Sequence, residues 1–368
     1  MALEFLGQYW NPSTRSVHLL GKGDNEVHDL TPHLPYPSAR GKLREGCAAL
    51  SCYALLQESA PFPAAQAVLE AEAGGTTVPA LLEPAWRKAL KSKQPLDESA
   101  LSRAPDAKQP HLLACIIPLR AQAFGVTYEN SSLERTAEGQ KADYGYVYRS
   151  VRERGERCEI FIKGTRLSHF FGPNGWMGLR GDLNNSVDAK GQPKERVTVL
   201  AGIEPELGAV TYSNGRILGY TLCNDGSGNQ IENESILYLY QAKYFAGSMG
   251  IGPWLLLSDE QNNPRIHFAV RVLNGEGREL YAGEADSSLI GMAIHKLVAQ
   301  AASHNALYPG ELFSTGTNIV PGGEAKVLQP GWRVEIRSER LGTFAHSAAL
   351  VSAHENPNPD YHRLERER

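Results

Sequence analysis

The stretch 204-EPELGAVTYSNGRILGYTLCND-225 decides the predicted fold. A Ser-Asn-Gly turn signal at 213–215 separates two apolar runs and predicts a β-hairpin. Glu204 and Glu206 are two residues apart, so in a strand both side chains point to the same face. Asp225 lies at the end of the partner strand. The sequence therefore predicts that these three carboxylates converge.

A cluster of three carboxylates suits a divalent cation. Like charges on one face repel each other unless a cation lies between them. Carboxylates from neighbouring strands supply the oxygen ligands that hard ions such as Mg²⁺ prefer, and such ions usually keep waters that a substrate can displace. The alternative interpretation is a set of solvated strand charges without a bound ion.

Further motifs lie in and around this hairpin. They read 159-EIFIKG-164, 178-GLRGD-182, 219-GYTLCND-225, 241-QAK-243, 251-IGPW-254 and 315-TGT-317. Together with 204-EPELG-208 they resemble the fumarylacetoacetate hydrolase superfamily over roughly Leu113 to Ala349, and look most like its 2-keto-3-deoxy-pentonate (arabinonate or xylonate) dehydratase branch. The resemblance implies that Glu204, Glu206 and Asp225 bind Mg²⁺, with Mn²⁺ or Ca²⁺ as alternatives.

The length of the chain and the change in its sequence pattern after about residue 110 predict two domains, because 368 residues are many for one typical core. We expect a smaller N-terminal α+β domain and linker over residues 1–110. A metal-binding catalytic domain would follow over residues 111–368, with an insertion near 188–203. Short strands and glycine turns dominate this second part. The predicted class is therefore α+β and β-rich, with a mixed sheet forming a barrel or roll.

Local patterns predict several individual elements. Apolar alternation indicates strands at Glu4–Trp10 and Ser16–Leu20. The polar, proline-punctuated stretch Pro84–Pro110 is typical of a linker. The apolar run Leu113–Leu119 predicts a buried strand, and a helix is expected around Leu289–Asn305.

Composition argues against several classes of protein. A net charge of −4 gives no electrostatic support for binding nucleic acid or anionic membranes. No apolar run approaches the roughly 18 residues that span a bilayer, and Met1–Asn11 lacks the pattern of a signal peptide, so we expect a cytoplasmic protein. Five cysteines without a Cys-x-x-Cys pair argue against a disulfide framework and a zinc cluster. Cys223 is interpreted as a packed core thiol rather than a nucleophile.

The resemblance places two candidate catalytic residues in the active site, Lys243 and Glu159. A partly buried lysine next to a cation has a lowered pKa, which suits proton transfer or contact with an oxyanion. Glu159 matches the place where dehydratases of the superfamily carry an acid–base glutamate. The alternatives are an exposed lysine before a turn and a salt bridge at a strand edge.

Candidate substrate-binding residues are Lys163, Gly316, Thr317 and Arg180. Gly316 and Thr317 match the turn whose backbone N–H and hydroxyl hold the substrate carboxylate in the family. Glycine lets the backbone approach an anion closely. Lys163 follows Glu159 by four residues, so both lie on one face of an extended strand.

One departure from the family pattern concerns substrate recognition. Family members usually carry Arg four residues after the metal-binding aspartate, followed by Asp, where this chain has Asn229 and Gln230. Arginine makes a rigid bidentate contact with a carboxylate, and asparagine does not replace that charge. Arg180 or Arg135 is then the candidate for the missing cation.

Several reactions of a small 2-oxo acid fit these residues. The main hypothesis is dehydration of a 2-keto-3-deoxy sugar acid across C3–C4 through a metal-stabilised enolate. A C–C hydrolase of a 2,4-dioxo acid, of the fumarylacetoacetate or acylpyruvate type, typically needs a lid histidine, and the chain has none between Val126 and Glu156. A 2-oxo acid decarboxylase or isomerase and a non-catalytic binding protein are further alternatives. The resemblance also implies a homodimer.

Overall fold

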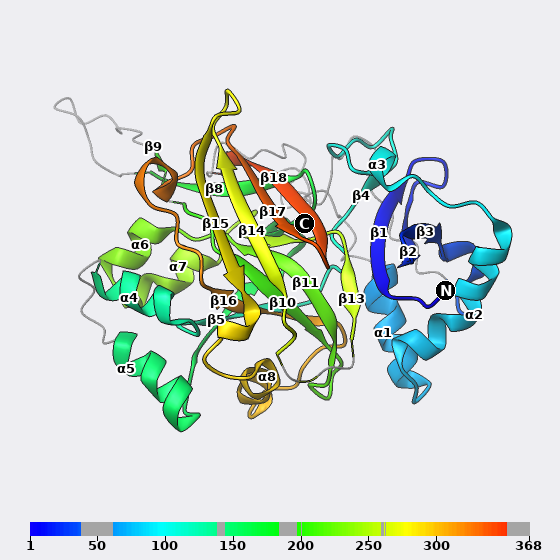
Figure 1. Ribbon diagram of the computed structural model, residues 1–368, viewed down its shortest axis with the longest axis horizontal. Coiled ribbons are helices and arrows are strands. Elements are labelled where there is room, and N and C mark those ends of the chain that lie inside the picture. Colours follow the sequence, from blue (N-terminus) through cyan, green and yellow to red (C-terminus); the bar gives the residue numbers. More distant parts are fainter. Residues whose placement is uncertain are drawn as a thin grey trace.

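The computed structural model describes residues 1–37, 62–137, 144–183, 197–199, 201–258, 261 and 263–351. The described strands form two mixed sheets, one of 12 strands and one of six (Figure 1). Leu207 and Leu222 of the larger sheet share one hydrophobic core with Val270 and Ile336 of the smaller sheet. The two sheets therefore pack against each other over a common core.

The strands of the larger sheet are β1 Phe5–Asn11, β2 Ser16–Gly23, β3 Glu26–Asp29, β4 His111–Leu112, β5 Ala121–Gly125, β6 Glu159–Gly164, β7 Phe170–Phe171, β10 Pro205–Thr211, β11 Ile217–Asp225, β12 Met249–Ile251, β13 Leu255–Leu257 and β16 Glu311–Thr317. Its main path runs β3-β2-β1-β13-β11-β10-β16-β5-β6. The smaller sheet contains β8 Trp176–Leu183, β9 Val197–Val199, β14 His267–Leu273, β15 Glu279–Asp286, β17 Arg333–Ser338 and β18 Gly342–Val351. Its order is β15-β14-β17-β18-β8-β9.

The helices lie around these sheets (Figure 1). They are α1 Pro63–Ala73, α2 Val78–Ser92, α3 Glu98–Leu101, α4 Glu129–Ala137, α5 Tyr144–Arg149, α6 Asn229–Glu234, α7 Leu239–Lys243 and α8 Ile294–Ala302. α8 falls inside the range predicted from the sequence. None of the helices in the described ranges combines the length and the apolar character that a membrane crossing needs.

The predicted hairpin is confirmed. β10 and β11 pair in antiparallel register and are buried along their whole lengths. The turn between them contains Gly215 at φ +79°, a conformation that glycine adopts without steric cost. β10 begins at Pro205, so Glu204 lies one residue before the strand. Cys223 is a free, buried thiol whose pKa is raised well above the usual value by burial, in agreement with a core role.

The N-terminal strands join the larger sheet. The two predicted strands are present as β1 and β2, and β1 pairs with β13 as well as with β2 and β4. Figure 1 shows this region with α1 and α2 at one end of the molecule, linked to the rest through β13. The division into two domains at residue 110 stays a prediction.

The predicted linker is wrong over its first part. Pro84 lies inside α2, which continues to Ser92. Proline lacks the N–H for one helical hydrogen bond, but Trp86 is fully buried in the core and its packing favours the helix. The hydroxyl of Thr77 caps α2, and this N-cap is a start signal present in the sequence.

Residues 113–118 are buried and Leu119 is exposed, but the run does not form the predicted strand. The side chain of Gln8 donates to the carbonyl of Ala114 at 2.9 Å. The amide of Cys115 donates to the carbonyl of Gly252, also at 2.9 Å. These hydrogen bonds satisfy backbone polar groups of the segment without pairing it to a neighbouring strand. The apolar run therefore predicted the burial of residues 113–118 correctly, but it predicted their secondary structure wrongly.

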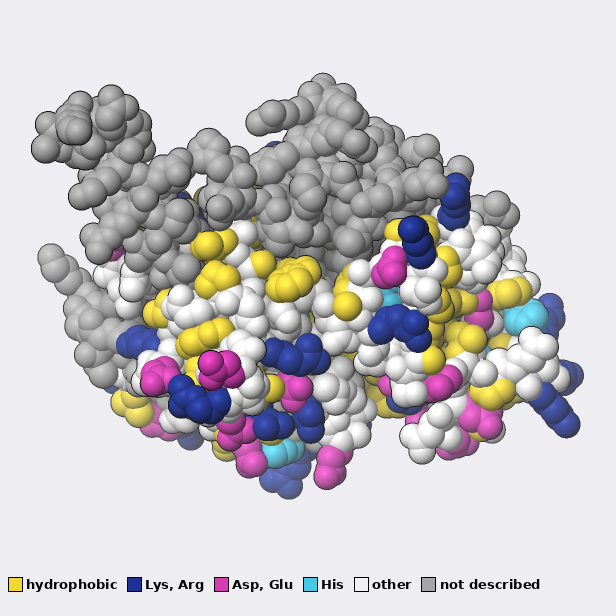
Figure 2. All heavy atoms as spheres, turned by 90° about the horizontal axis from the view of Figure 1, so that it is seen from above, with side chains coloured by type: hydrophobic (Ala, Val, Ile, Leu, Met, Phe, Trp, Pro, Cys, Tyr) yellow, Lys and Arg dark blue, Asp and Glu magenta, His cyan; other side chains and the backbone are white. Residues whose placement is uncertain are grey.

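Neither sheet closes into a ring among the described strands, so the barrel or roll stays a prediction and the observed class is α+β with mixed sheets. The predicted insertion near 188–203 lies largely outside the described residues, although β9 pairs with β8 in antiparallel register. On the face in Figure 2, positive and negative side chains are interspersed over the described surface.

Candidate metal centre

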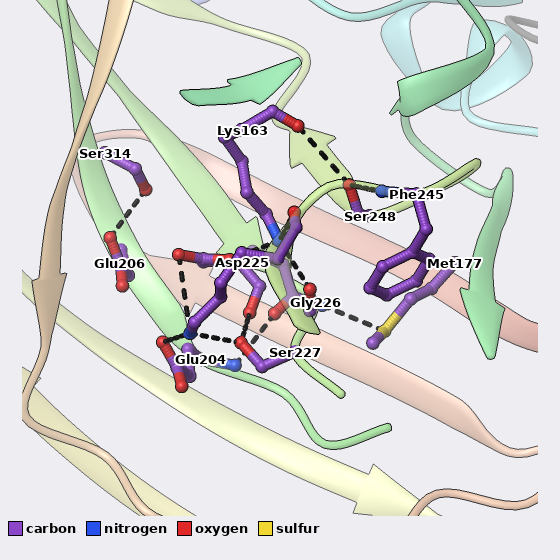
Figure 3. A network of polar contacts seen from close by, with 12 residues as sticks. Lys163, Met177, Glu204, Glu206, Asp225, Gly226, Ser227, Phe245, Ser248 and Ser314 are labelled. Carbon is purple, nitrogen blue, oxygen red and sulfur yellow. Dashed lines mark hydrogen bonds and ion pairs between the residues drawn. The ribbon is translucent and has the colours of Figure 1, made fainter. Parts of the chain in front are cut away.

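The three acids lie where β10 and β11 pair. Glu206 in β10 is opposite Cys223, and Asp225 is the last residue of β11. The carbonyl of Glu204 accepts a 2.9 Å hydrogen bond from the Asp225 amide. Oxygens from the three carboxylates lie within 4.8 Å of one another. One hairpin therefore brings the three carboxylates together (Figure 3).

Glu206 is held on the buried side of this cluster. It is 1% exposed, and its Oε2 accepts hydrogen bonds from the Ser314 hydroxyl at 2.6 Å and from the Gly316 amide at 2.8 Å. Burial first, and then the charges of Asp225 and Glu204, raise the pKa of Glu206 well above its usual value. A cation between the carboxylates would relieve this repulsion.

Lys163 contacts Asp225 from within the core. Its ammonium group lies 2.5 Å from Asp225 Oδ1 and donates to the carbonyls of Gly226 at 2.5 Å and Lys243 at 2.7 Å. Burial lowers the pKa of Lys163, and the charge of Asp225 opposes that shift. Burial also raises the pKa of Asp225, against the effect of the two lysines. Lys163 therefore fixes both Asp225 and the end of α7.

Lys243, at the end of α7, contacts the more open side of the cluster. Its ammonium group lies 2.8 Å from Glu204 Oε2 and 2.5 Å from the Ser227 hydroxyl. It is 3.8 Å from Asp225 Oδ2. The side chain of Glu204 is 16% exposed, unlike those of its two partners. Lys243, itself only 1% exposed, thus contacts the acid of the cluster that is partly exposed.

These groups fit a divalent cation. Three carboxylates and two ammonium groups leave one net negative charge, and a divalent cation turns this into one net positive charge. Asp225 Oδ2 is buried and has no hydrogen-bond partner in the described chain, so it is available as a ligand. The three side chains offer only oxygen donors, which Mg²⁺ prefers.

A pocket with both polar and apolar lining residues opens beside Glu204. Its volume is about 520 Å³, including the space that is continuous with solvent. Glu204 and Thr317 both line it. The hydroxyl of Thr317 donates to the carbonyl of Pro205 at 2.9 Å, so this wall is tied to the strand that carries Glu206. A small polar ligand in the pocket would reach the cluster from the Glu204 side.

The four predicted substrate-binding residues have different surroundings. Thr317 lines the pocket, whereas Gly316, at φ +95°, directs its amide to Glu206. Lys163 is fully buried beside the cluster. Arg180 in β8 donates to the carbonyl and side chain of Gln241. Their roles in binding substrate stay predictions.

Glu159 begins β6, the strand that also carries Lys163. A Cβ atom at Gly125 would lie 1.9 Å from Glu159 Oε2, so the carboxylate lies directly over the backbone of β5. β5 in turn pairs with β16, the strand of Gly316. The glycine at position 125 provides the space for this carboxylate, and the acid–base role of Glu159 stays a prediction.

Comparison with known proteins identifies the family. Residues 201–348 match the family model described as fumarylacetoacetate (FAA) hydrolase C-terminal. A Haloferax volcanii protein named probable 2-keto-3-deoxyxylonate dehydratase is 31% identical over 238 residues, which are 64% of this chain and 75% of that protein. The chain belongs to the fumarylacetoacetate hydrolase family. The resemblance inferred from the motifs is thereby confirmed.

Two further comparisons agree with this assignment to the fumarylacetoacetate hydrolase family, one in sequence and one in fold. A Saccharolobus solfataricus protein named 2-dehydro-3-deoxy-D-arabinonate dehydratase is 30% identical over 256 residues, covering 68% of this chain and 78% of that protein. A solved structure of 2-keto-3-deoxy-D-arabinonate dehydratase complexed with magnesium and 2,5-dioxopentanoate has a TM-score of 0.64 at 22% identity. It covers 94% of this chain and 99% of its own, so the fold is shared over nearly the whole of both.

The family departure at position 229 falls in the pocket wall. Asn229 lines the pocket, whereas the neighbouring Gln230 is exposed and does not. Arg135 lies in α4, but its side chain is outside the described part of the chain. Lys326 also lines the pocket, and the sequence analysis missed it. No local motif marks Lys326, because the pocket joins it to residues far away in the sequence.

Proposed function

We propose that this fumarylacetoacetate hydrolase family member is a divalent-metal-dependent hydro-lyase that dehydrates a 2-keto-3-deoxy sugar acid. The observation that carries the proposal is the cluster of Glu204, Glu206 and Asp225, braced by two lysines and open onto the pocket beside Glu204. The names of the two relatives support this reaction class. Mg²⁺ is the proposed ion, since the solved neighbour contains magnesium.

The charge of the cluster favours a substrate with one carboxylate. The net positive charge of the loaded cluster is balanced by the single negative charge of a 2-oxo acid. A bound divalent ion would polarise the 2-oxo group and thereby acidify the C3 protons. Thr317 and the adjoining pocket provide polar contacts for a small substrate on the side where Glu204 is accessible.

The proposed dehydration also needs a base and an acid, and we assign both roles to side chains of this protein. We assign removal of the C3 proton to Glu159, which shares β6 with Lys163. Lys243 would protonate the departing C4 hydroxyl, because its ammonium group contacts Glu204, the acid that lines the pocket. The C3–H and C4–O bonds break, a C3=C4 double bond forms, and one water leaves. Both transfers are general acid–base steps.

The test is incubation of the purified protein with Mg²⁺ and a panel of 2-keto-3-deoxy pentonates and acylpyruvates. Products are identified by mass. We expect loss of one water from a sugar acid, whereas two fragments from an acylpyruvate would indicate a C–C hydrolase instead. Asp225→Asn should abolish turnover, and Glu284→Gln, which alters an exposed carboxylate of β15, should not. Absence of turnover across the panel by the Mg²⁺-loaded protein would reject the proposal.

A further inference from the structure

Asn229 has an unsatisfied polar group in the pocket beside the metal centre. It is the first residue of α6 and lines the pocket that Glu204 also lines. Its side-chain oxygen is buried and has no hydrogen-bond partner in the described ranges. A buried amide oxygen without a partner is unfavourable, and a hydroxyl group on a bound ligand would satisfy it.

Close packing fixes the position of this amide. A Cβ atom at Gly202 would lie 2.6 Å from the Asn229 side-chain nitrogen and 3.2 Å from the carbonyl oxygen of Lys326. Gly202 also exchanges two backbone hydrogen bonds with Ser227, at 2.8 and 3.0 Å. The Ser227 hydroxyl accepts from Lys243. The amide is therefore held in a set position relative to the metal centre, as a selective contact requires.

The charges of the pocket disfavour a second carboxylate on the ligand. Glu204 and Glu232 both line the pocket, and Lys326 is the cation among its described lining residues. Glu232 follows Asn229 by three residues in α6, so the two side chains lie on neighbouring positions of one helix face. A carboxylate bound at Asn229 would meet the Glu232 carboxylate, and none of the described lining residues offers it a guanidinium group.

From these observations we infer that Asn229 is a specificity-determining residue. It selects 2-oxo acids whose far end carries an uncharged hydroxyl group over those that carry a second carboxylate. The inference rests on the proposed function and narrows its substrate class. The 2-oxo acid head would bind at the metal centre, and the hydroxylated tail would extend along the pocket to Asn229.

The test compares ligands with the same head and different tails. Binding of pyruvate, 2-oxopentanoate, 5-hydroxy-2-oxopentanoate and 2-oxoglutarate to the Mg²⁺-loaded protein is measured by calorimetry. None of these acids has a C4 hydroxyl, so none can lose water in the proposed reaction. We expect 5-hydroxy-2-oxopentanoate to bind about three- to tenfold more tightly than 2-oxopentanoate, the range for one neutral hydrogen bond. 2-Oxoglutarate should bind more weakly than both.

Asn229→Leu replaces the amide by an apolar group of the same branched shape and the same number of side-chain heavy atoms. In this variant the advantage of the hydroxylated acid over 2-oxopentanoate should disappear, while the affinity for pyruvate stays unchanged. Gln230→Met is the matched control, because it removes the next amide of α6, which is exposed and outside the pocket. It should retain the preference of the wild type.

The outcomes separate this inference from the proposed function. A wild-type protein that binds pyruvate but prefers 2-oxoglutarate, or shows no preference for the hydroxylated acid, overturns the inference alone. The same follows if Asn229→Leu keeps the preference. Failure of the Mg²⁺-loaded wild type to bind any of the four acids overturns the proposed function as well. If Asn229→Leu does not fold, the order in which the wild type binds the four acids decides whether the inference stands.

Discussion

The acidic cluster has a buried side and an open side, and they are built differently. On the buried side, Glu206 and Asp225 are each 1% exposed. They are fixed by groups that come from other strands, among them Lys163. On the open side, the side chain of Glu204 is 16% exposed and contacts Lys243. The buried side therefore sets the geometry of a cation site, and the open side presents that site to a ligand.

The largest effect should follow from changing Asp225 to Asn. This removes a carboxylate from the buried side and leaves the charge of Lys163 uncompensated. We expect the affinity for Mg²⁺, measured by calorimetry, to fall by more than about 100-fold. Mutating a residue that only contacts a metal ligand already lowers metal affinity by about 10- to 100-fold, and Asp225 is itself a proposed ligand. Turnover should be lost. Unchanged Mg²⁺ affinity would show that the cluster is not the metal site.

Substituting the two lysines in turn should affect stability and turnover differently. Lys163→Met leaves Asp225 buried without its nearest cation, so the metal-free protein should lose about 3–5 kcal/mol of unfolding free energy. Lys243→Met removes the partner of Glu204, which is partly exposed, so the unfolding free energy should fall by only about 1–3 kcal/mol. This is the range for losing a hydrogen bond to a charged group. Turnover should nevertheless fall strongly in Lys243→Met.

Urea unfolding of both variants, with and without saturating Mg²⁺, measures this difference. Bound Mg²⁺ should restore part of the stability lost in Lys163→Met, because it supplies positive charge next to Asp225. Equal losses in the two variants, or a larger loss in Lys243→Met, would contradict the distinction between a buried and an open side.

The same comparison explains which parts of the site the sequence could predict. The convergence of Glu204, Glu206 and Asp225 follows from local rules, a two-residue strand period and one tight turn, and the hairpin is present as expected. The contact between Lys163 and Asp225 depends on the strand order of the larger sheet, in which β6 and β11 are not neighbours. No local pattern encodes such an order, so the sequence could only suggest Lys163 as a ligand for substrate.

The errors in the fold have a similar physical origin. In the apolar run from residue 113 to 119, backbone polar groups form hydrogen bonds with residues far away in the sequence, such as Gln8. No local pattern reveals these partners. The helix through Pro84 was missed because the polar, proline-punctuated stretch from Pro84 onward is typical of a linker, and the N-cap signal of Thr77 was not used. In the structure, burial of Trp86 outweighs the lost hydrogen bond. Tertiary packing decided in both places, and it acts over distances that sequence periodicity does not report.

The last predicted effect depends on pH and concerns Asn224, which contacts the Glu204 backbone, and its partner His346. Asn224 Oδ1 accepts from the Glu204 amide at 3.1 Å, and its Nδ2 lies 3.0 Å from His346 Nε2. Burial lowers the pKa of His346 from 6.5 to about 3. The folded protein therefore holds a neutral imidazole that can accept a hydrogen bond from Asn224.

Because the pKa of His346 is lower in the folded state, the unfolded chain binds more protons between pH 6.5 and about 3. The stability contributed by the neutral ring is complete above pH 6.5 and declines as the pH falls through this window. Between pH 7 and pH 5 the wild type should lose about 2 kcal/mol more than His346→Gln, which has no titrating ring. Urea unfolding at the two pH values measures this, and parallel losses would mean that His346 is protonated in the folded protein, so that Asn224 is not held by a neutral ring.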